Sequence, residues 1–97
     1  MACDTVTAGG KTFTILTEQN APNREHFEVT LSGVRPVLWG ERFEDRLWLW
    51  SASGKQVLRH TLGTPLAPCA ATNPIIEAAV EAVLSVIGET APIAAAA

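Results

Sequence analysis

The sequence predicts an α+β fold: a single antiparallel β-sheet of four to six strands in meander order, with one C-terminal amphipathic helix packed on one face. Short β-rich runs separated by turn residues fill the chain to residue 62, and a helical period follows over 73–88. The short connections favour strands that pair in sequence order. At 97 residues the chain has the length of one domain, which we expect to span residues 1–91, followed by an alanine-rich tail at 92–97 that frays.

A glycine turn predicts a hairpin near the start of the chain. Residues 5–7 and 12–17 are rich in Thr, Val, Ile and Phe, which favour strands, and Gly9 and Gly10 lie between them. A proline and two asparagines in 20–23 then end the second strand.

A third strand is predicted at residues 25–32, where apolar and polar side chains alternate. Its apolar side chains share one face of the strand, which we expect to be half-buried. One face carries Phe27, Val29 and Leu31, and the other carries His26, Glu28, Thr30 and Ser32.

The next strands are less regular. Residues 34–39 contain Pro36, which cannot donate to a ladder, so we expect an edge strand or a bulged segment there. Gly40 is expected to interrupt the strand. Residues 42–51 are the longest strand candidate, and residues 56–62 are expected to return beside it as its antiparallel partner.

The helix at 73–88 has clear boundaries in the sequence. Asn73 is a favourable N-cap, Pro74 suits the first helical position because an N–H has no partner there, and Gly88 suits the C-terminal end. Before the helix, residues 62–68 form a linker that two prolines stiffen. The apolar side chains recur at spacings of three and four residues: Ile76, Ala79, Val80, Val83, Leu84 and Ile87.

The charge and composition exclude several classes of protein. Ten acidic and seven basic residues give a net charge of −3, which argues against a broad nucleic-acid interface. No run approaches the ~18 uninterrupted apolar residues of a membrane span, and the first residues lack the features of a secretory signal. We therefore expect a cytoplasmic protein without membrane or direct nucleic-acid contact, in which Cys3 and Cys69 are reduced.

Residues that could support catalysis or hold a metal form no recognisable motif. The Gly-Lys-Thr at 10–12 lacks the first glycine of a phosphate-binding loop and leads into a strand rather than a helix. His26 has Glu28 on the same strand face, which supplies two ligands where a catalytic zinc needs three. His60 is expected to be partly buried among leucines. We predict no catalytic residue, no metal and no cofactor.

The candidate strand at 42–51 is apolar on both faces at its C-terminal end, where leucines alternate with tryptophans. If the leucines face the helix, the tryptophans share the uncovered face with arginines, a pairing enriched in binding hot spots. In that arrangement we expect the partner-binding residues to be Arg42, Arg46, Trp48 and Trp50, with Trp39 nearby.

The opposite arrangement packs Trp48 and Trp50 under the helix. Burial of one large apolar side chain contributes about 1.5–3 kcal/mol, against a total stability of about 5–15 kcal/mol. Tryptophans left wholly exposed would forfeit much of this, so either the fold or a partner must cover them. Both arrangements remain open at the level of sequence.

A second candidate surface is the acidic face of the helix. Glu77 and Glu81 lie one turn apart, on a different side from the apolar residues. They are expected either to be solvated or to dock against a basic groove of a partner.

We recognise no family motif in the chain, and the absence of catalytic motifs favours a small non-catalytic protein-binding domain that modulates or inhibits a larger host protein by occupying its surface. Phage or mobile-element inhibitors of host defence, anti-CRISPR proteins among them, are often of this size. The chain is expected to be a monomer or homodimer. One alternative is a structural subunit of a homo-oligomer or virion particle. Another is a small enzyme or ligand carrier that uses His60 or Cys69 in a pocket between helix and sheet.

Overall fold

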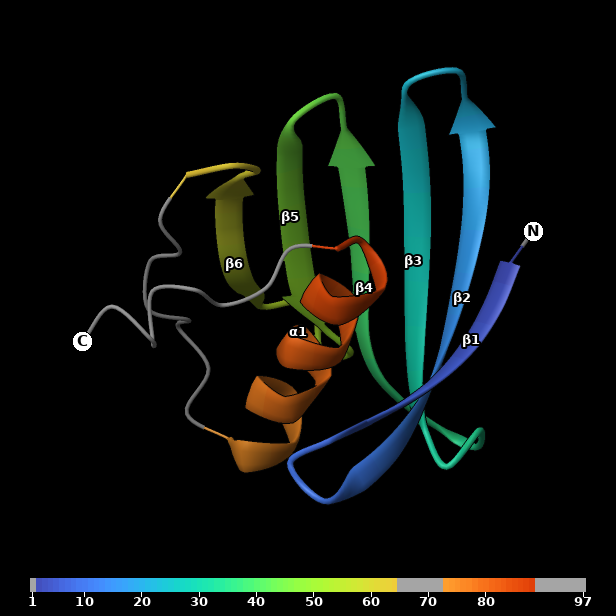
Figure 1. Ribbon diagram of the computed structural model, residues 1–97. Coiled ribbons are helices and arrows are strands. Elements are labelled where there is room, and N and C mark those ends of the chain that lie inside the picture. The colour runs from blue at the N-terminus through green and yellow to red at the C-terminus, as the bar shows by residue number, and fades with distance from the viewer. Residues whose placement is uncertain (1, 65–72, 89–97) are drawn as a thin grey trace.

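A computed structural model describes residues 2–64 and 73–88, and it shows the α+β architecture that the sequence predicts. Six strands pair in sequence order as one antiparallel meander, with β1 and β6 at the two edges, and helix α1 packs on one face (Figure 1). The elements are β1 (Ala2–Ala8), β2 (Lys11–Ala21), β3 (Arg24–Leu31), β4 (Arg35–Phe43), β5 (Arg46–Ser51), β6 (Gln56–Thr61) and α1 (Pro74–Val86).

The first hairpin forms as predicted because two glycines fill its turn. Gly9 and Gly10 adopt φ values of 58° and 75°, in the left-handed region that residues with a Cβ rarely enter. Gly9 also lies against the helix, since an added Cβ would come within 2.9 Å of the Ala78 Cβ atom. The turn therefore joins the sheet to α1 as well as β1 to β2.

Strand β4 is a central strand, so the expectation of an edge strand is wrong, whereas the expectation of a bulge is confirmed. Val29 pairs with Leu38 and Thr30 pairs with Pro36, which leaves Val37 as the extra residue. The bulge accommodates the proline because the ladder is already irregular there. Gly40 does not interrupt the strand.

The single strand predicted at 42–51 is in fact the end of β4, a two-residue turn and β5. Phe43 pairs with Arg46 across the turn, whose first residue, Glu44, has a φ of 56°. Glycine is favoured at such a position, so the sequence carries no ordinary sign of this hairpin. The turn is held from outside its own strands, because the Glu44 N–H donates to the Asn23 carbonyl oxygen at 3.1 Å.

Helix α1 begins and ends where its capping residues predict. The Asn73 Oδ1 atom accepts a hydrogen bond from the Ile75 N–H at 2.8 Å, Pro74 is the first helical residue, and Gly88 has a φ of 78° just past the end. The predictions for Cys69, for the prolines of the linker and for the tail at 92–97 concern residues outside the described part of the chain.

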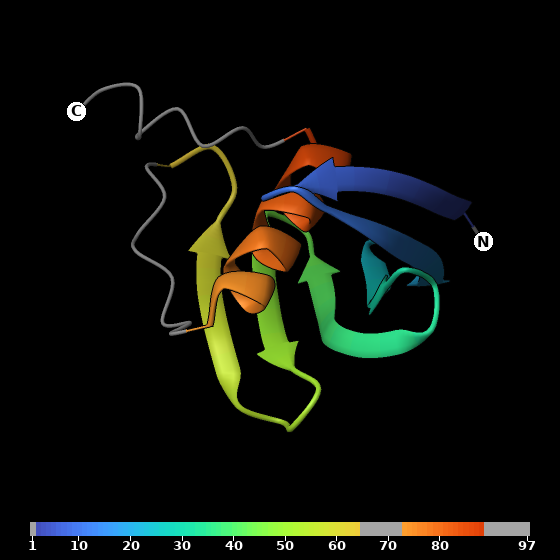
Figure 2. The ribbon, with the colours of Figure 1, turned by 90° about the horizontal axis from the view of Figure 1, so that it is seen from below.

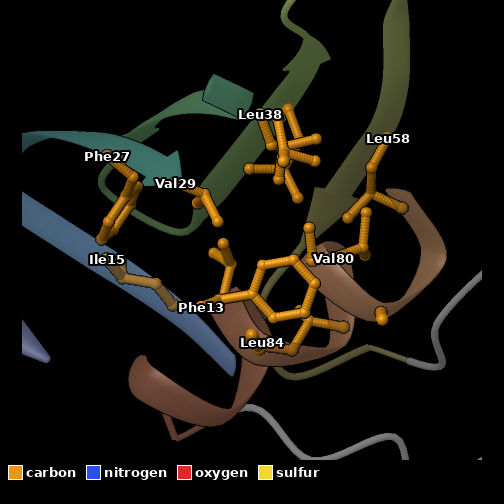
Figure 3. Close-up of a cluster of buried hydrophobic side chains, with 14 of the residues drawn as sticks. Phe13, Ile15, Phe27, Val29, Leu38, Leu58, Val80 and Leu84 are labelled. Atoms are coloured by element: carbon orange, nitrogen blue, oxygen red, sulfur yellow. The ribbon is translucent and has the colours of Figure 1, made fainter. Parts of the chain in front are cut away.

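The sheet curves around α1, which contacts β1, β2 and β4, and the core lies between these two layers (Figure 2). Figure 3 shows Phe13, Ile15 and Phe27 from the sheet gathered with Val80 and Leu84 from the helix. Leucines of β5 also belong to this core. Leu47 and Leu49 are both 0% exposed.

Candidate functional site

The face of the sheet opposite α1, here called the outer face, is not covered by any element of residues 2–64 and 73–88. Side chains alternate along a strand, so the buried Leu47 and Leu49 place Trp48 and Trp50 on the outer face. Trp39 joins them because it pairs directly with Trp50. All three tryptophans of the chain therefore lie on the outer face, and the arrangement that packs them under the helix is wrong.

All three tryptophans are partly buried, and two of them cover each other. The rings of Trp39 and Trp50 stack with their centroids 4.3 Å apart and an interplanar angle of 15°. The His26 ring lies 6.2 Å from the Trp39 ring at a tilt of 35°. Ring stacking of this kind adds about 0.5–1.5 kcal/mol beyond the area buried. The rings thus form an ordered apolar platform while keeping part of their surface open.

The β3 and β4 half of the outer face carries its charged side chains beside partners from the same chain. The Arg24 Nε atom lies 3.2 Å from a Glu41 carboxylate oxygen, and the guanidinium carbon of Arg24 lies 5.5 Å from the centroid of the Phe43 ring. The His26 Nε2 atom lies 3.5 Å from a Glu28 carboxylate oxygen. Charged side chains in this half already have partners within the protein.

The β5 and β6 half of the outer face is different, because its charges are positive and none of the ion pairs seen in the described part of the chain includes them. Trp48 pairs directly with Arg59, and Arg46 pairs with Thr61 one step along the ladder. These four residues, together with His60 from the same strand as Arg59, line a polar pocket of about 360 Å³. Both arginines are exposed. We call Arg46, Trp48 and Arg59 the arginine corner.

A second hollow lies beside Trp39, where the bulge opens the outer face. It has a volume of about 380 Å³, and its lining includes His26, Glu28, Pro36 and Ala52. The volume is near the lower end of the range of about 300–1,000 Å³ that ligand pockets occupy. Trp39 lines this hollow and also stacks on Trp50, so the outer face has an indentation next to its aromatic rings.

Arg42 does not lie with the tryptophans, which corrects the face predicted for it. The hairpin turn places Arg42 opposite Leu47, and therefore on the helix-bearing side of the sheet. There its Nη1 atom lies 3.4 Å from a Glu25 carboxylate oxygen, and its Nε donates to the Glu44 carbonyl oxygen at 3.3 Å. These contacts hold the hairpin turn in place.

Glu77 and Glu81 are exposed on α1, on the side of the helix that faces away from the sheet. The tryptophans lie on the sheet face opposite α1, and Figure 2 shows the helix and the sheet as two separate layers. A single flat partner surface cannot cover both regions. The acidic helix face and the outer face are therefore two separate candidate surfaces.

Sequence reasoning missed Arg59 as a candidate, because its place beside Trp48 follows from strand register rather than from any local motif. His60 is 7% exposed and lies on the helix side of β6, opposite Leu47. A hollow between the start of α1 and strands β4 and β5 has a volume of about 150 Å³, smaller than most ligand pockets.

Within residues 2–64 and 73–88, no three His, Cys, Asp or Glu side chains cluster as metal ligands do. The described helix is too short to cross a membrane. Comparison with known proteins finds no matching family model, no similar curated protein and no similar solved structure.

Proposed function

We propose that this protein is a small non-catalytic binding domain that modulates or inhibits a larger protein by laying its outer face on that protein's surface. The observation that carries the proposal is the gathering of all three tryptophans on the one sheet face that the described chain leaves uncovered. Tryptophan and arginine are the side chains most enriched among residues that dominate binding energy.

The geometry of the outer face supports this use. The Trp39 and Trp50 rings are fixed by stacking, so little side-chain entropy is lost when a partner covers them. Apolar rings at the centre with charged residues around them match the usual composition of a protein interface. An inhibitor of host defence encoded by a phage or mobile element, such as an anti-CRISPR protein, fits this mode of action.

The test is capture of a partner with matched variants. The wild-type protein, a Trp48→Ser variant and a Glu81→Ser variant are immobilised, and proteins from a lysate of the source cells are identified by mass spectrometry. A supporting result is one purified protein that binds the wild type and Glu81→Ser equally, and binds Trp48→Ser at least about tenfold more weakly, as loss of a hot-spot residue predicts.

Two outcomes would contradict the proposal. In the first, a folded Trp48→Ser variant captures the same protein as strongly as the wild type. In the second, light scattering shows that the wild type self-associates through the outer face and that Trp48→Ser is a monomer. The second result would assign the chain to the homo-oligomer alternative instead.

A further inference from the structure

The arginine corner differs from every other charged region of the outer face in its balance of charge. Arg24 and His26 each lie beside a carboxylate of the same chain, at 3.2 Å and 3.5 Å. Among residues 2–64 and 73–88, the pocket at the corner is lined by Arg46, Trp48, Arg59, His60 and Thr61, none of which is acidic. The corner therefore has an excess of positive charge in a protein whose net charge is −3.

Strand register places Arg46 and Arg59 near each other on adjacent strands. Arg46 pairs with Thr61 and Trp48 pairs with Arg59, so the two arginines are diagonal neighbours on one face of β5 and β6. Diagonal neighbours in an antiparallel pair are about 7–8 Å apart, within reach of one another for long side chains. Two arginines within reach of one another repel, and a carboxylate placed between their guanidinium groups would interact favourably with both.

We propose that the protein partner of the outer face presents an acidic segment, and that a carboxylate of this segment is held between Arg46 and Arg59 against the ring of Trp48. This inference rests on the proposed use of the outer face. Planar guanidinium groups bind carboxylates with two parallel hydrogen bonds, and the indole supplies an apolar floor on which the stem of a Glu or Asp side chain packs.

Charge complementarity favours an acidic protein over nucleic acid as the occupant. A nucleic acid presents a line of phosphates, and its affinity comes from many basic contacts. Two arginines lie at the corner, with no ion pair to the residues that the structure describes, and the same face carries carboxylates at Glu18, Glu28 and Glu41, which would repel a phosphate backbone. A short acidic segment of a protein can approach the corner from β6, the edge strand on the side of the sheet away from β2 and β3.

The first test uses ¹⁵N-labelled protein and a blocked hexapeptide, Glu-Asp-Leu-Glu-Asp-Leu, as the probe. We expect saturable shifts of the Trp48 indole N–H and of the side-chain N–H signals of Arg46 and Arg59. An Arg46→Gln, Arg59→Gln variant should bind the peptide about tenfold or more weakly, because charge-assisted hydrogen bonds are lost. A matched Lys11→Gln, Arg35→Gln variant, which loses the same charge elsewhere, should bind like the wild type.

The inference is overturned if both double variants bind the peptide equally weakly compared with the wild type. It is also overturned if the peptide causes no shift of the Trp48, Arg46 and Arg59 signals. Inorganic phosphate or a thymidine decamer that shifts these signals at a lower concentration than the peptide would also overturn it, in favour of a simple anion or nucleic-acid site.

A second test separates this inference from the proposed function. The affinity of the captured partner is measured for the Trp39→Ser variant and for the double variant Arg46→Gln, Arg59→Gln. Weaker binding of the partner by both variants supports the inference of an acidic segment. Weaker binding by Trp39→Ser alone overturns the inference of an acidic segment and leaves the outer face as the binding surface. Unchanged binding in both variants overturns the proposed function itself.

Discussion

Gly40 is required in the middle of β4 for its lack of a side chain rather than for its backbone conformation. It pairs with Phe27 on one side and Leu49 on the other, within the buried face of the sheet. A Cβ atom added there would overlap the Leu49 side chain and lie 2.9 Å from the Trp48 carbonyl oxygen. The empty position lets Leu49 lie across β4 and complete the core.

The first prediction concerns this close contact. Gly40→Ala should lower the free energy of unfolding by about 1–3 kcal/mol, the usual cost of overpacking, as measured by urea denaturation. Leu49→Ala should cost about 2–5 kcal/mol in the wild type and less in the Gly40→Ala background, because the new methyl group fills part of the space. Strictly additive losses would show that the two residues do not compete for the same volume.

The side on which each residue lies depends on features that a local pattern does not contain. Arg42 and Trp48 are both even-numbered, and a continuous strand would have put them on one face. The turn at Glu44 changes the alternation, so that Arg42 lies opposite Leu47. The choice between leucines and tryptophans for the core was likewise undetermined, since both faces of β5 are apolar.

Among the elements, α1 is the one whose ends follow most directly from side-chain chemistry. Asn73 supplies the capping hydrogen bond, Pro74 has a fixed φ suited to the first turn, and Gly88 adopts the left-handed conformation past the end. The first hairpin was predictable for a similar reason, because glycines at both turn positions are a strong local signal. The hairpin between β4 and β5 lacks such a signal.

The second prediction concerns the cap of α1. Asn73→Ala removes the oxygen that accepts from the Ile75 N–H and should destabilise the protein by about 0.5–2 kcal/mol, measured by thermal or urea unfolding followed by circular dichroism. Asn73→Asp restores an accepting oxygen at the same place and should recover most of the loss. Equal destabilisation in the two variants would mean that the side-chain hydrogen bond does not stabilise the helix.

For the whole molecule, the main consequence of the two-layer architecture is that the two faces of the sheet carry different aromatic residues. Phe13 and Phe27 are almost fully buried on the helix side, whereas the three tryptophans lie on the outer face. The α+β class and the meander were predictable from periodicity and short connections. The composition of the outer face was not, because it depends on which residues of different strands pair.

The third prediction uses this division as a reporter. Because all three indoles are partly exposed on one face, acrylamide should quench the tryptophan fluorescence of the native protein measurably, and more strongly after unfolding in urea. Addition of a partner that covers the outer face should reduce quenching of the native protein. Native fluorescence that resists acrylamide until the protein unfolds would contradict the placement of the tryptophans on the outer face.

The place of α1 in the chain has a consequence for biosynthesis. All six strands leave the ribosome before the helix that shields Phe13, Ile15, Leu47 and Leu49. The nascent meander therefore exposes an apolar surface until α1 packs on it. Such a surface is a target for chaperones and proteases. Any nonsense mutation upstream of residue 74 therefore yields a polypeptide that the cell is expected to clear rather than accumulate.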